Sequence, residues 1–147
     1  MKKVFRAVLS LALVLCLGAA GTIVVGATNV DAREAESIPT RLSYTNLTAT
    51  SISISGGQAT CLGHITGYNG TTTKVEITLY LERKLASSSS WSTYASGTKQ
   101  TFNSYSGTYQ MKKAVVSGYQ YRTRAVYTAY AGSKSETITG YSNVVSY

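Results

Sequence analysis

The strongest constraint on this chain is a strict alternation of apolar and polar residues, clearest between residues 74 and 82. In that segment every odd position is aliphatic and every even position is polar or amphipathic. A period of two places the aliphatic side chains on one face of an extended strand and the polar ones on the other. The segment is therefore predicted to be a half-buried strand, with one face on a core and one in water.

The same alternation recurs along the chain. It is found in residues 50–55, 59–65, 119–130 and 137–147, and short runs rich in Gly, Ser and Asn separate these segments. Such runs are typical of turns, and nothing after the first thirty residues has helical periodicity. Strands at this spacing over about a hundred residues favour an antiparallel sandwich or barrel. We predict an all-β fold, with a single antiparallel β-sandwich of about seven strands over residues 43–147.

Residues 1–32 have the pattern of a secretory signal peptide helix. Three cations lie among the first six residues, and residues 7–30 carry no charge. The alternative is an uncleaved membrane anchor, since the uncharged segment exceeds the roughly 20 residues that cross a bilayer. In both cases the cations stay inside and the rest of the chain is exported, as expected of a secreted or outward-facing protein.

Small residues offer two cleavage points in this segment, after Ala27 and after Ala32. The second is preferred, because it leaves a polar new terminus. Residues 33–42 are then expected to form a short mobile leader before the sandwich.

Cysteine usage excludes a disulfide framework. Cys16 lies inside the signal peptide, with Leu15 where a lipoprotein signal has a small residue. Cleavage leaves Cys61 as the only cysteine, so the domain must be held by its core alone. We expect Cys61 to be a small buried hydrophobe. An intermolecular disulfide or a reactive thiol is the alternative.

The most specific local motif runs from Val115 to Tyr121. An aliphatic residue, a turn with Gly118 and a tyrosine three residues later predict a tyrosine corner, in which the Tyr121 hydroxyl bonds to nearby backbone. The motif resembles that of the fibronectin type III domain, which has Leu, Pro, Gly and Tyr at this spacing. Val115 stands for the Leu and Ser117 for the Pro, whereas Gly118 and Tyr121 match.

The position of the only tryptophan departs from that family. A fibronectin domain carries its core Trp on the second strand, whereas Trp91 follows the strand at residues 74–82. The resemblance therefore implies an immunoglobulin-like sandwich rather than strict fibronectin membership.

The span from Cys61 to Tyr147 also resembles small uncharacterised exported proteins of Gram-positive gut bacteria. The residues that carry this likeness are Leu79-Tyr80-Leu81-Glu82-Arg83-Lys84, Trp91, Gly118-Tyr119-Gln120-Tyr121-Arg122, Ser135-Glu136 and Tyr141-Ser142. These are scaffold motifs, and the family implies no activity.

Catalytic groups are scarce, so we expect no enzyme, no metal and no cofactor. Glu76 and Glu82 lie six residues apart on one strand face, about 20 Å, which is too far for a glycosidase pair. Both are expected to be solvated. Cys61 and His64 are three residues apart, which places them on opposite faces of a strand and excludes a thiol–imidazole pair.

Basic charge and aromatic residues remain as candidate binding features. The net charge is +8, which attracts anionic partners. Lys112, Lys113, Arg122 and Arg124 come onto one sheet if their strands pair. Separately, the middle of the chain is rich in aromatic residues, which bind sugars and peptides well when exposed: Trp91, Tyr94, Tyr105 and Tyr109. An alternative is that the tyrosines are ordinary strand residues and the cations only keep the protein soluble.

The function that fits best is a secreted, non-enzymatic binding module at or outside the bacterial surface. Its partner is expected to be an anionic cell-wall polymer, a glycan or another protein, and not nucleic acid; a membrane is a partner only if the N-terminal segment is uncleaved. The second hypothesis is a small secreted bacteriocin-like toxin, although no amphipathic cationic helix is present.

Overall fold

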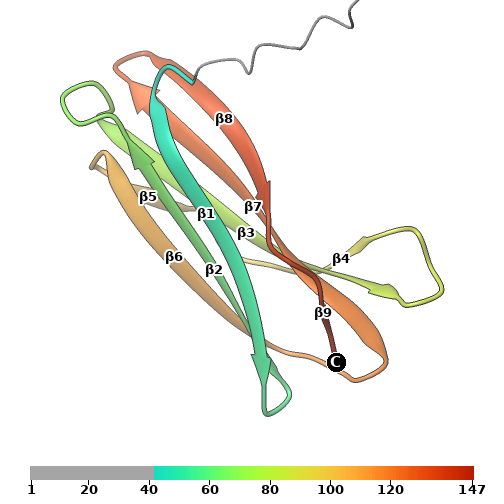
Figure 1. The fold of residues 1–147 in the computed structure, drawn as a ribbon. Coiled ribbons are helices and arrows are strands. Elements are labelled where there is room, and N and C mark those ends of the chain that lie inside the picture. Colours follow the sequence, from blue (N-terminus) through green and yellow to red (C-terminus); the bar gives the residue numbers. More distant parts are fainter. Residues whose placement is uncertain (1–41) are drawn as a thin grey trace, which may run out of the picture. The chain divides into compact units, whose positions relative to one another are not determined.

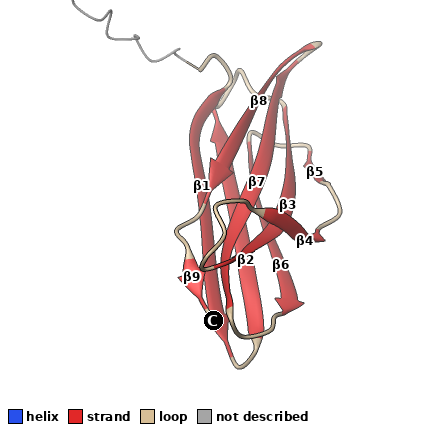
Figure 2. Cartoon of the chain, turned by 90° about the vertical axis from the view of Figure 1, so that its right-hand side faces the viewer, coloured by secondary structure: helices blue, strands red, loops and turns tan. Residues whose placement is uncertain are grey.

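The computed structural model describes residues 42–147, which form nine strands and no helix (Figures 1 and 2). All pairings between strands are antiparallel, and the predicted all-β sandwich is confirmed. The predicted signal peptide and nearly all of the predicted leader lie outside the described residues. The strands are β1 (Thr45–Ser55), β2 (Gln58–Gly67), β3 (Lys74–Leu85), β4 (Ser92–Ser96), β5 (Gln100–Phe102), β6 (Ser106–Ala114), β7 (Tyr119–Ala131), β8 (Lys134–Tyr141) and β9 (Val145–Ser146).

The strands form two sheets. The first has the order β1-β2-β6, and Figure 1 shows these three strands side by side in one layer. The second has the order β4-β3-β7-β8, with β5 also paired to β3 and β9 to β7. The core lies between the inner faces of the two sheets.

The central pair of the second sheet follows directly from the alternation in the sequence. β3 and β7 pair along their length, from Lys74 opposite Tyr130 to Leu85 opposite Tyr119. Along most of both strands the odd-numbered residues point inward. The core includes Val75, Ile77, Leu79, Leu81, Tyr121, Ala125, Tyr127 and Ala129, all fully buried. The first sheet contributes Ile52, Ala59, Cys61, Ile65 and Met111. Period two in the sequence therefore locates the core correctly.

The structure has nine strands rather than about seven. The strand that carries Lys112 and Lys113 begins earlier than the sequence indicates, because Ser106 and Gly107, which have the composition of a turn, are the first two residues of β6. Gly107 is buried and packs against the Phe102 ring, which leaves no room for a Cβ atom. A glycine required by close packing inside a strand looks in sequence like a turn glycine.

The predicted tyrosine corner is confirmed. The Tyr121 ring is fully buried, and its hydroxyl donates to the Val116 carbonyl at 2.9 Å and accepts from the Val116 N–H at 3.2 Å. Gly118 has φ +89°, a left-handed conformation that permits the turn into β7. Tyr121 thus ties the connection from β6 to the first residues of β7.

A carboxylate on β8 holds the beginning of β1. Glu136 accepts hydrogen bonds at 2.9 Å from the backbone N–H groups of both Ser43 and Tyr44. Burial raises the pKa of the Glu136 carboxyl, but the hydrogen bonds from residues 43–45 outweigh it and lower the pKa below its ordinary value. This contact joins the first sheet to the second at one margin of the sandwich.

Removal of the Tyr121 hydroxyl tests the corner. We expect Tyr121→Phe to lower the free energy of unfolding by about 1 kcal/mol, because the ring still packs but the two backbone bonds are lost. Tyr119→Phe is the control, since no hydrogen bond of the Tyr119 hydroxyl holds a turn. Urea denaturation followed by fluorescence measures both, and equal effects would contradict the role of the corner.

The Glu136 contact predicts a pH dependence of stability. A carboxyl whose pKa is lowered by folding contributes stability above its unfolded pKa, near 4.5, and loses it as the pH falls through the folded pKa. Glu136→Gln should therefore reduce the stability difference between pH 7 and pH 3, as measured by urea unfolding. An unchanged slope in the variant would show that the contact does not stabilise the fold.

Candidate functional site

Two arginines meet over one carboxylate on the outer face of the second sheet. Arg122 lies opposite Glu82 in the register of β7 and β3, and Arg124 lies one position further along the same face. The Arg122 Nε donates to Glu82 Oε2 at 2.8 Å, and the Arg124 Nε donates to Oε1 at 2.6 Å. Each carboxylate oxygen thus orients one guanidinium.

Aromatic rings flank both guanidinium groups. Arg122 lies between the rings of Trp91 and Tyr141, at 4.3 and 4.4 Å from their centroids, and Arg124 lies 3.9 Å from the Tyr80 centroid. Cation–π stacking and the Glu82 hydrogen bonds together fix each group in plane and position. We call Glu82, Arg122 and Arg124, with the rings of Tyr80, Trp91 and Tyr141, the arginine centre.

The arginine centre has a net positive charge, and its two arginine side chains are partly exposed to solvent. Glu82 is 7% exposed, whereas the side chains of Arg122 and Arg124 are 24% and 25% exposed. The bonds to Glu82 use the Nε donors, which leaves terminal N–H groups on both arginines for an acceptor from solution. Together with Glu82 the two oriented guanidiniums carry a net charge of plus one, which suits a carboxylate, sulfate or phosphate group.

A second cluster of similar composition lies further along the same face of β3. The Glu76 carboxylate accepts hydrogen bonds from Lys74 at 3.3 Å, from Lys99 at 3.2 Å and from the Tyr130 hydroxyl at 2.9 Å. Lys74 also lies 3.7 Å from the centroid of the Tyr130 ring. We call these four residues the lysine centre.

Hydrogen bonds determine the ionisation of the carboxylate in the lysine centre. Burial raises the pKa of Glu76, but the hydrogen bonds from Tyr130, Lys99 and Lys74 outweigh it, so the pKa lies below its ordinary value. Glu76 is therefore charged at neutral pH. Two lysines over this one carboxylate leave a net charge of plus one.

The expectation that Glu76 and Glu82 are solvated is wrong. Their exposed fractions are 9% and 7%, because cations and aromatic rings from neighbouring elements cover them. Alternation places them on the outer face correctly. It cannot reveal the long side chains that lie across that face from β7, from β8 and from the loops around β4.

The condition under which the four cations would share one sheet is not met. Lys112 and Lys113 lie on β6, which pairs with β2 in the first sheet, whereas Arg122 and Arg124 lie on β7 in the second. Both lysines are exposed. Of the residues proposed from sequence, the structure brings together only Arg122, Arg124 and Trp91.

Three residues of the arginine centre are missed by the sequence analysis as binding residues: Tyr80, Glu82 and Tyr141. Tyr80 and Glu82 alternate on β3 with the buried aliphatic residues, so their face could be predicted. Their partners could not, because these depend on the register of β3 with β7 and of β7 with β8. Other aromatic residues from the middle of the chain lie outside the arginine centre. Tyr94 packs on Tyr121, and Tyr109 lies on β6.

Cys61 and His64 lie on opposite faces of β2, as alternation predicts. Cys61 is fully buried and free, and burial raises the pKa of its thiol, with a smaller opposing effect of the Thr123 hydroxyl. His64 Nδ1 is hydrogen-bonded to Thr108 and its Nε2 to Thr66. The imidazole is thus held by hydroxyl groups on the outer face of the first sheet.

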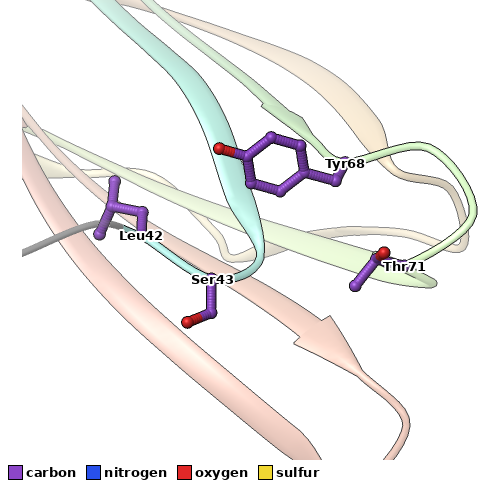
Figure 3. Close-up of a pocket in the computed structure, with 4 residues that line it drawn as sticks. All are labelled: Leu42, Ser43, Tyr68 and Thr71. Carbon is purple, nitrogen blue, oxygen red and sulfur yellow. The ribbon is translucent and has the colours of Figure 1, made fainter.

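A hollow of the described surface lies away from both centres. It encloses about 600 Å³ and is lined by Leu42, Ser43, Tyr68 and Thr71, as Figure 3 shows. None of these four described residues is charged, and none belongs to the arginine centre. Within residues 42–147 no three His, Cys, Asp or Glu side chains are grouped to hold a metal ion. The same residues contain no helix with the length and hydropathy needed to span a bilayer.

Comparison with known proteins gives a structural likeness only. The chain matches no protein-family model, and no curated protein matches its sequence. Among solved structures it is similar to the solution structure of CsgH from R. palustris, at 18% identity and a TM-score of 0.37. That match covers 63% of this chain and 87% of CsgH. The function of this protein is therefore argued from its own residues.

The Glu82 carboxylate should be essential to the arginine centre. We expect Glu82→Gln to lower the free energy of unfolding by about 2 kcal/mol, because two neighbouring guanidiniums lose their shared counter-charge. The cost is limited by the partial exposure of both arginines. Urea denaturation measures the change, and Thr78→Val, on the same face of β3, is the control. A Glu82 variant as stable as the parent would show that the ion pairs contribute nothing.

Proposed function

We propose that this protein is an exported, non-enzymatic binding module that recognises an acidic polymer at or outside the bacterial surface. The observation that carries the proposal is the arginine centre, in which Glu82 holds two guanidiniums side by side. Charge-assisted hydrogen bonds from oriented guanidiniums are strong, and little side-chain entropy remains to be lost when a ligand binds.

The state of the acid–base groups supports a role other than catalysis. Glu76 and Glu82 are each engaged by two cations, and His64 is hydrogen-bonded on both ring nitrogens. The Cys61 thiol is buried with a raised pKa, which favours the unreactive protonated form. A binding role needs only the terminal N–H groups that the bonds to Glu82 leave free, and the flanking rings.

The export of the module, its immunoglobulin-like assignment and its family likeness remain predictions. Export rests on the charge and hydropathy pattern of residues 1–32. The immunoglobulin-like assignment is supported by the grouping of β1, β2 and β6 against β3, β7 and β8, which corresponds to strands A, B, E and C, F, G of such domains. The Tyr121 corner adds to that support. The likeness to exported proteins of Gram-positive gut bacteria has no further support.

Binding of the exported protein to two immobilised polyanions tests the proposal. The probes are a wall teichoic acid, which carries phosphates, and polygalacturonate, which carries carboxylates. We expect retention of the protein on at least one of them at low ionic strength, with affinity that falls as salt is added. No retention on either would contradict the proposal.

A triple variant separates the arginine centre from general basic charge. The variant combines three substitutions, Glu82→Gln, Arg122→Gln and Arg124→Gln. It lowers the net charge by one and leaves no buried charge without a partner. It should weaken binding by at least about tenfold, the value of one charge-assisted hydrogen bond.

The control is Lys112→Gln with Lys113→Gln, which lowers the net charge by two on the other sheet. If general charge carried the binding, this control would lose more affinity than the triple variant, and the proposal would be wrong. Thermal unfolding of both variants checks that the sandwich is retained.

A further inference from the structure

The arginine and lysine centres repeat one construction on a single face. Each has a carboxylate of β3 under two cations, with an aromatic ring stacked on at least one of them. Each keeps a net charge of plus one. Glu76 and Glu82 are six residues apart on the same side of one strand, a separation of about 20 Å at strand rise.

Partly or fully exposed residues line the surface between the two centres. The outward residues there are Thr78 on β3, Val126 on β7 and Thr139 on β8, which are neighbours in the sheet register. None of them is charged. The outward positions of β3 and β7 carry only two acids, Glu76 and Glu82, and both are covered, so nothing along this path repels an anionic chain.

The outer face of the first sheet carries few cations. The outward positions of β1, β2 and β6 are mostly Ser, Thr, Ala and Gln, and Lys112 is the only Lys or Arg among them. Cations with covered counter-charges are thus concentrated on the outer face of the second sheet. This asymmetry is what a surface for one elongated anionic partner requires.

Aromatic rings beside the cations indicate which polyanion fits. The Trp91 and Tyr141 rings flank Arg122, and Tyr130 lies beside Lys74. Tyr141 is 52% exposed, so a large part of it remains free for contact. Aromatic rings pack against the apolar faces of sugar rings, whereas a flexible polyol phosphate chain offers no such face.

We propose that the outer face of the second sheet is a two-centre site for a linear carboxylated polysaccharide that lies along β3. The proposal rests on the proposed function and names its ligand class. The arginine centre binds one uronate carboxylate, the lysine centre binds a second one along the same chain, and the rings contact the sugars. Because both contacts lie on one ligand, the second is intramolecular and adds affinity without a new partner.

A series of oligogalacturonates of increasing length tests this site by isothermal titration calorimetry. A disaccharide cannot span the two centres and should bind weakly through the arginine centre. Once the chain is long enough to reach both, the affinity should rise by about tenfold or more, as expected for a tethered second contact. Affinity that rises only in proportion to the number of sugars would overturn the two-centre site.

A second triple variant removes the lysine centre alone. This variant combines Glu76→Gln, Lys74→Gln and Lys99→Gln. Like the arginine-centre variant, it leaves no buried charge without a partner. It should abolish the gain in affinity for long chains and leave the affinity for the disaccharide unchanged. The variant with Lys112→Gln and Lys113→Gln should keep the gain. A gain that survives loss of the lysine centre would overturn the proposal.

The outcomes distinguish this inference from the proposed function. Binding of teichoic acid but not of galacturonate chains, with loss in the arginine-centre variant, would overturn the ligand class and leave the binding function intact. Binding of galacturonate without a length threshold would overturn the second centre only. Binding of neither polymer would overturn both.

Discussion

The antiparallel pairing of β3 with β7 is the interaction on which the rest of this structure depends. It runs along the whole of β3, and its inner face is aliphatic or aromatic and fully buried at most positions. Burial of that face fixes the register, because a slip of one residue would turn every apolar side chain outward. The register in turn places Arg122 opposite Glu82. The hydrophobic core thus determines the geometry of the charged face behind it.

The outer face of the second sheet carries two buried carboxylates, and each of them is paired with two cations. A carboxylate removed from water costs free energy unless it is paired and hydrogen-bonded. Glu82 meets two arginines and Glu76 meets two lysines and a tyrosine hydroxyl, so both acids are satisfied from several directions. The same arrangement leaves each cluster with an excess cation held in a defined position. The contacts that stabilise the acids therefore also position the excess cations on which the proposed ligand binding rests.

The candidate site was only partly accessible from sequence. Arg122, Arg124 and Trp91 could be named because cations and tryptophan stand out in a strand-rich chain. Lys112 and Lys113 would join them only if β6 paired with β7, and nothing in the alternation shows that β6 pairs with β2 instead. Tyr80 and Tyr141 were missed because they reach the arginines from the two strands that flank β7. β3 and β8 are far apart in the sequence, so it does not show that both lie next to β7.

The sequence by itself determined which face of each long strand is buried, the all-β class and the Tyr121 corner, because these depend on side-chain alternation and on residues near one another in the chain. Tertiary structure alone decided which strands are neighbours, that β6 already begins at Ser106 and Gly107, and that Glu76 and Glu82 lie covered beneath cations. The physical reason is that these features arise from contacts between segments tens of residues apart. Such contacts follow from the packing of two sheets around one core, which no local pattern specifies.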